Sequence, residues 1–144
     1  MSSWRWIDRR TLELLHDESI AEHGGAAGIR DQGLFESALA RPLNLSVYGD
    51  PDIADLAAAY GVGLAKNHAF VDGNKRVAFL AVGLFLAING RRLVATQAEA
   101  TLTMLAVASG TLDEPAFAQW LREHSAAKPF TASAGDPRPR SAKE

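Results

Sequence analysis

Residues 67–88 read Asn-His-Ala-Phe-Val-Asp-Gly-Asn-Lys-Arg-Val-Ala-Phe-Leu-Ala-Val-Gly-Leu-Phe-Leu-Ala-Ile. The first ten of these residues include an imidazole, a carboxylate, two amides, an ammonium and a guanidinium, whereas the last twelve carry no charge. An apolar run of this length is too short to cross a bilayer, so it indicates a helix buried inside a protein. The stretch therefore predicts a polar site mounted on a central buried helix at about residues 74–88.

The composition is that of one soluble globular domain. The chain has 144 residues, of which 47% are hydrophobic and 22% charged, and these are ordinary values for that class. A net charge of −2 gives no electrostatic reason to expect nucleic-acid binding. The absence of cysteine excludes a disulfide framework and fits a reducing compartment. Since the N-terminus also lacks an apolar core of signal-peptide length, we expect a cytoplasmic protein that binds neither DNA nor a membrane.

Hydrophobic periodicity and capping residues predict six helices with short connections, and hence a compact all-α bundle. Pro42 is expected to end the second helix and to be followed by an ordered loop as far as Pro51. Thr96 and Thr111 each begin a capping-box pattern, which should start the last two helices. The expected helices cover about residues 9–23, 32–40, 52–66, 74–88, 96–108 and 111–124.

Three further segments complete the expected organisation. Residues 91–95 should be a short extended connection, compatible with a small hairpin. Alanines and glycines within residues 57–63 leave little side-chain bulk on the third helix, so a neighbouring helix can approach closely. The domain is expected to span residues 1–125, and residues 126–144, which are rich in Pro and in basic side chains, are expected to form a disordered tail.

The polar loop leads into the N-terminus of the central helix. There the first backbone N–H groups have no partner within the helix and the helix dipole is positive. Asn74, Lys75 and Arg76 add donors at the same end, and Gly73 would let a ligand approach the backbone closely. Cations at this position are unfavourable for the helix itself, so two of them indicate a bound anion, above all a phosphate.

Two side chains of the loop have the chemistry for group transfer. His68 can take a proton from a hydroxyl near neutral pH. Asp72 could hold Mg²⁺ together with phosphate oxygens, or orient the base. Together with the phosphate cradle, these groups suggest transfer of a phosphorus-containing group to a hydroxyl. The alternative is that Asp72 and Asn74 merely cap the central helix.

Residues 68–76, His-Ala-Phe-Val-Asp-Gly-Asn-Lys-Arg, resemble the motif of the Fic/Doc family, in particular that of the death-on-curing (Doc) toxins of type II toxin–antitoxin modules. The resemblance extends over about residues 6–124 and includes Gly28 to Pro42. It implies an all-α fold with the motif in the loop before a central helix. It also implies that His68 is the catalytic base, that Asp72 binds Mg²⁺, and that Gly73, Asn74 and Arg76 cradle the phosphates of ATP.

Lys75 separates the two chemistries of the family. Members that transfer AMP have glycine at this position, where a bulky cation would obstruct the usual nucleotide pose. Doc toxins share the lysine, which implies transfer of the γ-phosphate of ATP to elongation factor Tu and arrest of translation. Ala69 in place of proline also favours the Doc type, whereas Gly73 matches the Fic pattern. Lys66 falls where the best-known Doc toxin has an arginine, so it is either a phosphate contact or a solvated helix end.

The resemblance also implies a partner. Doc toxins are held by a small antitoxin whose C-terminal segment packs into a groove on the toxin. We expect that groove on the alanine- and glycine-rich faces and on the first two helices. Two alternatives to the kinase remain: a Fic-type transferase that moves AMP to a protein hydroxyl, and a catalytically silent module that binds a partner. A zinc enzyme is not indicated, because the four histidines lack short ligand spacing.

Overall fold

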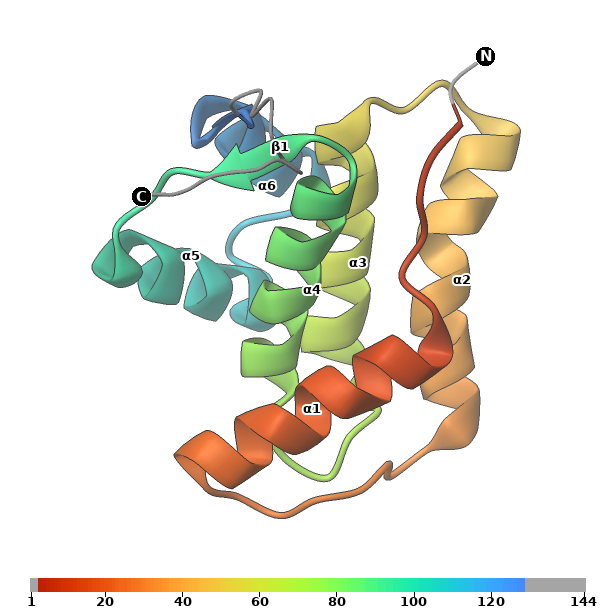
Figure 1. Cartoon of the computed structure of the whole chain (residues 1–144), viewed down its shortest axis with the longest axis vertical. Coiled ribbons are helices and arrows are strands. Elements are labelled where there is room, and N and C mark those ends of the chain that lie inside the picture. The colour runs from red at the N-terminus through yellow and green to blue at the C-terminus, as the bar shows by residue number, and fades with distance from the viewer. Residues whose placement is uncertain (1–2, 129–144) are drawn as a thin grey trace, which may run out of the picture.

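The computed structural model describes residues 3–128, which form six α-helices and one small two-stranded sheet (Figure 1). The all-α prediction is confirmed. The elements in chain order are α1 (Arg9–His23), α2 (Gln32–Tyr48), α3 (Ile53–Asn67), α4 (Asn74–Ile88), β1 (Arg91–Leu93), α5 (Gln97–Ser109), α6 (Glu114–Glu123) and β2 (Ser125–Ala127). Within the described residues, no helix is both long and apolar enough to cross a membrane.

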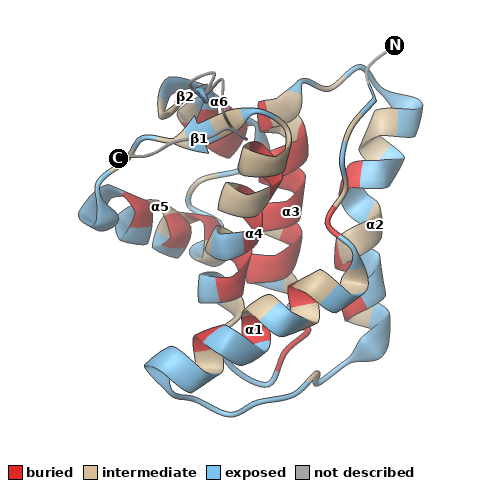
Figure 2. Ribbon diagram, viewed as in Figure 1, coloured by how far each residue is buried: buried red, intermediate tan, exposed pale blue. Residues whose placement is uncertain are grey.

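The third and fourth helices form the centre of the molecule. α3 contacts α2, α4, α5 and α6, and α1 packs on α4 at the end where the polar loop lies (Figure 1). The buried residues concentrate on α3 and on the facing side of α4 (Figure 2). α4 itself contacts α1, α3, α5 and β1, which agrees with the uncharged run from residue 77 to residue 88.

Small residues on α3 allow its neighbours to come close. A Cβ atom placed on Gly61 would lie 2.7 Å from Phe117 of α6 and 2.8 Å from Val82 of α4. These distances are too short for real atoms, so both neighbouring helices use the space that the missing side chain leaves. The prediction that this segment permits close helix approach is confirmed. The same residues are buried, however, so they cannot form an open groove for a partner. That part of the expected groove is wrong, whereas its placement on the first two helices stays a prediction.

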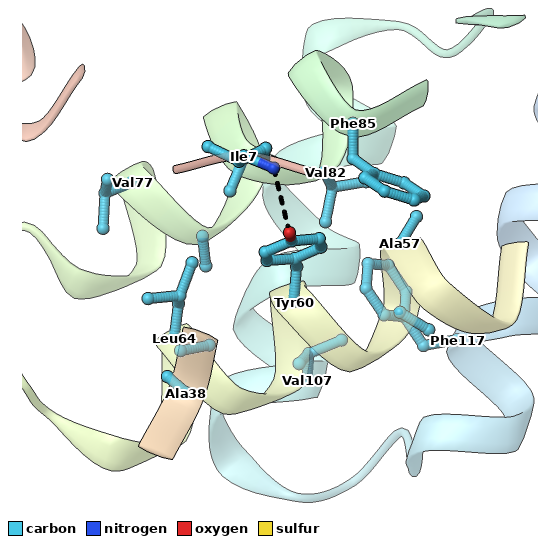
Figure 3. Packing of buried hydrophobic residues seen from close by; sticks show 14 of the residues in the cluster. Ile7, Ala38, Ala57, Tyr60, Leu64, Val77, Val82, Phe85, Val107 and Phe117 are labelled. Carbon is cyan, nitrogen blue, oxygen red and sulfur yellow. Dashed lines mark hydrogen bonds between the residues drawn. The ribbon is translucent and has the colours of Figure 1, made fainter. Parts of the chain in front are cut away.

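The N-terminal segment is tied to the core by one buried hydrogen bond. The backbone N–H of Ile7 donates to the hydroxyl of Tyr60 at 3.1 Å (Figure 3). Burial raises the pKa of the Tyr60 phenol above its usual value. The Tyr60 ring also packs against Phe85 of α4, with 5.2 Å between the ring centroids. The phenol therefore satisfies its polar atom while its ring fills the core.

The second helix is longer than the sequence suggests. Pro42 lies inside α2, which continues to Tyr48, so the expected loop over residues 43–51 is wrong for its first six positions. Pro42 is itself buried, and Leu45 packs against the core one turn later. That burial offsets the hydrogen bond that proline cannot make.

Two other boundaries differ from the prediction. The last helix begins at Glu114, because Asp113 rather than Thr111 caps it, accepting from the Ala116 N–H at 3.0 Å. Thr111 instead exchanges a hydrogen bond with Ser109. The first of the predicted capping boxes, Thr96 with Glu99, is confirmed.

The expected extended connection is strand β1, but it forms no hairpin. It pairs antiparallel with β2, so that Arg91 faces Ala127 and Leu93 faces Ser125. The segment predicted as a tail begins at Ala126. Its first two residues thus lie in a strand, and Lys128 donates its N–H to the carbonyl of Gly90 at 2.9 Å. The remainder, residues 129–144, lies outside the described residues.

Candidate active site

The polar loop, residues 68–73, joins the C-terminal end of α3 to the N-terminal end of α4. His68 ends α3 in the left-handed conformation, with φ 54° and ψ 46°. Within residues 3–128 it is the one non-glycine residue with positive φ. Such a conformation costs on the order of 1 kcal/mol and is concentrated at functional sites. Here it turns the chain sharply and leaves the His68 side chain exposed to solvent.

The connection between α1 and α2 runs alongside this loop and holds its backbone. The carbonyl of Ala69 accepts from the N–H groups of Arg30 and Asp31 at 2.7 and 3.1 Å, and the N–H of Val71 donates to Gly28 at 3.0 Å. The Arg30 guanidinium also donates through Nε to the carbonyl of His68 at 2.8 Å. The strained turn at His68 is therefore supported from outside the motif, by a side chain that the sequence analysis did not select.

Asn74 acts as a clamp on the loop. Its Oδ1 accepts from the Phe70 N–H and its Nδ2 donates to the Phe70 carbonyl, both at 3.0 Å. Phe70 is buried, and its ring meets Phe35 of α2 at 5.1 Å. The side-chain amide of Asn74 is thus already occupied by the backbone. Its predicted contribution to a phosphate would come from its main-chain N–H in the first turn of α4.

His16 was missed as a site residue. It lies on α1, where only 1% of its surface is exposed, and its Nε2 is 2.7 Å from the carbonyl oxygen of Asp72. Its ring stacks on that of Phe70, with 3.9 Å between centroids and 16° between planes. A histidine on the same face as the buried Leu12 is the only signal that the sequence offers, and it is indistinguishable from an ordinary core residue.

The Asp72 carboxylate is exposed and has room for a further ligand. Its Oδ1 accepts from the Gly73 N–H at 2.8 Å, and its Oδ2 accepts a long bond from the Ala26 N–H at 3.4 Å. In the described part of the chain no three His, Asp or Glu side chains cluster to hold a metal ion. Asp72 is thus a lone carboxylate, which suits Mg²⁺, an ion that commonly takes one or two protein carboxylates and completes its shell with water and phosphate.

The N-terminus of α4 differs from the other helix starts in the described chain. α1, α2, α3, α5 and α6 are each capped by an aspartate or threonine side chain, at Asp8, Asp31, Asp52, Thr96 and Asp113. The N-cap of α4 is Gly73, which has φ 74° and makes no side-chain cap.

Lys75 and Arg76 occupy that first turn, and both are exposed. Neither forms a salt bridge with another residue between positions 3 and 128. Uncapped N–H groups and two cations together favour an anion at this end of α4. The structure therefore places His68 and Asp72 in the loop that leads directly into this uncapped first turn of α4.

Lys66 has a different neighbour. Its ammonium lies 3.5 Å from the position that a Cβ atom on Gly110 would take, at the C-terminal end of α5. The helix dipole is negative there, so the lysine has a structural reason for its place. Its predicted contact with phosphate stays a prediction.

The sequence of this chain is similar to those of known proteins. The model of the Fic/DOC family matches residues 6–86. The chain is 47% identical over 93 residues to Toxin Doc of Mycolicibacterium smegmatis, covering 62% of this chain and 68% of that protein. It is 34% identical over 119 residues to Protein kinase doc of Escherichia phage P1, covering 82% of this chain and 94% of that protein.

The chain belongs to the Fic/Doc family. The matched region runs from the N-terminal segment through most of α4, so it contains the whole loop and the segment that pairs with it. The resemblance identified from residues 68–76 is confirmed. The roles of His68, Asp72 and the other individual residues stay predictions.

Proposed function

We propose that this chain is a Doc-type toxin, a kinase that transfers the γ-phosphate of ATP to a hydroxyl of a protein substrate and thereby arrests translation. Elongation factor Tu is the candidate substrate. The observation that carries this proposal is Lys75, an exposed cation in the uncapped first turn of α4, within an otherwise complete Fic/Doc motif. The relatives named Toxin Doc and Protein kinase doc support it.

In the proposed reaction, the substrate hydroxyl attacks the γ-phosphorus of ATP. His68 accepts the hydroxyl proton as the new P–O bond forms, and the bond to the β–γ bridging oxygen breaks to release ADP. The left-handed turn leaves the imidazole exposed to solvent, where a protein substrate can reach it.

The phosphates of ATP would lie at the N-terminus of α4. The N–H groups of its first turn and the side chains of Lys75 and Arg76 would neutralise their charge, while Gly73 removes side-chain bulk from the turn. Mg²⁺ bound by Asp72 would supply Lewis-acid stabilisation of the phosphate oxygens. Positioning and charge neutralisation are the main work in phosphoryl transfer, and the residues of this loop have the chemistry for both.

Purified protein incubated with elongation factor Tu and with γ-labelled or α-labelled ATP tests the reaction. We expect label on the substrate only from the γ-labelled nucleotide, and none with the His68→Ala variant. Label from the α-labelled nucleotide would instead identify AMP transfer. A silent partner-binding module predicts no transfer from either nucleotide, together with growth arrest that survives the His68→Ala change.

We propose that a small antitoxin restrains this activity by covering exposed leucines near the site. Leu14 on α1, Leu80 on α4 and Leu105 on α5 are all exposed, and α4 contacts both of the other helices. These side chains replace the buried alanine- and glycine-rich faces as the surface for the partner's C-terminal segment. Aspartate at Leu80 should weaken co-purification with the antitoxin, whereas Val47→Asp, at an exposed apolar position on α2, should not. Equal binding by both variants would refute this surface.

A further inference from the structure

His16 contacts the candidate active-site loop from the side that faces the protein core. It comes from α1, outside the motif, and is buried beneath the loop. Because a carbonyl oxygen can only accept, the 2.7 Å contact with Asp72 requires a proton on Nε2 of the imidazole. The bond therefore joins a buried donor to the backbone of Asp72, whose carboxylate is exposed.

The same ring touches the loop at one further residue and lies close to another. It stacks on Phe70, with centroids 3.9 Å apart, and its Nε2 lies 3.7 Å from where a Cβ atom on Gly73 would be. One side chain thus contacts Phe70 and Asp72 and lies beside the turn at Gly73. The exposed Asp72 carboxylate is held by the N–H groups of Gly73 and Ala26, both in the loops themselves, so its direction also depends on how firmly the loop backbone is held.

We propose that His16 is a positioning residue for phosphoryl transfer, which acts by fixing the backbone of Asp72 and the turn at Gly73. The inference rests on the proposed kinase function. His16 is buried and lies behind the loop, so it acts through Asp72 rather than on the substrate. Removing a residue that hydrogen-bonds to a metal ligand typically lowers metal affinity or activity about 10- to 100-fold. We therefore expect removal of the His16 donor to have an effect of at least about tenfold.

Two variants of similar length separate the hydrogen bond from the ring. His16→Gln can place an amide nitrogen near the position of Nε2, whereas His16→Met places a methyl group there. Both remove the aromatic stack on Phe70, so a difference between them reports on the donor alone. Ser19→Ala is the matched control, because Ser19 is buried on the same helix and its hydroxyl has no hydrogen-bond partner within the described chain.

Two measurements are made on each variant. The first is the Mg²⁺ concentration that half-saturates phosphate transfer, with kcat and KM for ATP determined separately. The second is amide hydrogen exchange over residues 68–74 without ATP or Mg²⁺. For His16→Met we expect half-saturation at a roughly tenfold higher Mg²⁺ concentration and about five- to tenfold faster exchange, as the loss of one hydrogen bond predicts. His16→Gln should stay closer to the parent in both measurements, and Ser19→Ala should match it.

The proposal is overturned if His16→Met exchanges as slowly as the parent, or if His16→Gln and His16→Met are equally impaired. In the second case His16 is a packing residue whose donor has no separate role. The exchange measurement needs no activity, so it tests the positioning role even if the parent transfers no phosphate. Failure of the kinase assay with the parent would reject the proposed function instead.

Discussion

Gly61→Ala should destabilise the protein, although alanine is the better helix former. In an exposed helix interior, replacing glycine by alanine gains about 1 kcal/mol. At Gly61 the added Cβ atom would lie 2.7 Å from Phe117 and 2.8 Å from Val82, both fully buried. Overpacking of a dense core costs about 1–3 kcal/mol and sometimes more, so after the gain in helix propensity we expect a net loss of up to about 2 kcal/mol.

Gly83→Ala supplies the matched control. Gly83 lies inside α4, and a Cβ atom placed there would meet nothing within 4 Å. It should therefore show the propensity gain alone, about 0.5–1 kcal/mol of added stability. Urea denaturation of the parent and both variants measures the difference between the two substitutions, which should equal the overpacking cost of about 1–3 kcal/mol. If Gly61→Ala proved as stable as Gly83→Ala, the close packing of α3 against α4 and α6 would be refuted.

Two other predictions concern the loop and the ion pair at the start of α3. Asn74→Ala removes both hydrogen bonds to Phe70 and should lower the free energy of unfolding by about 1–2 kcal/mol. Asn74→Asp should lower it more, because a carboxylate oxygen would face the Phe70 carbonyl. Equal stability of the two variants in urea denaturation would contradict the role of Asn74 as a clamp. The guanidinium of Arg122 holds the pKa of Asp52 below its usual value, so the pair contributes stability above the ordinary pKa of aspartate and loses it as pH falls through the lower folded value. Arg122→Gln should thus be less stable than the parent at neutral pH, and the difference in the free energy of unfolding should narrow at pH values below about 4. A difference independent of pH would contradict this.

Periodicity and capping chemistry predicted most of the fold because the deciding interactions are local. Asp8 and Thr96 cap the helices that they were expected to cap, since a cap is satisfied within three residues of its own position. Pro42 was wrongly expected to end the second helix, because its tolerance inside α2 depends on burial against other helices, which neighbouring residues do not encode. The pairing of β1 with β2 joins segments that are more than thirty residues apart, so no local signal could announce it.

The candidate site shows the same difference between local and long-range interactions. The sequence alone could propose His68, Asp72 and the cations of α4 as a site, because they fall within nine residues and their chemistry converges. The groups that hold this loop come from elsewhere: Arg30 supports the carbonyl of His68 and His16 that of Asp72. Each is an ordinary residue in its own segment, and only the fold brings it to the loop.

The most direct test of the central claim is the mass of the target protein recovered from cells that express this chain without its antitoxin. The kinase account predicts that elongation factor Tu, or another arrested translation factor, gains one phosphoryl group on a hydroxyl side chain. It also predicts that the gain is absent with His68→Ala. A gain of an adenylyl group, or growth arrest with every translation factor unmodified, would contradict it.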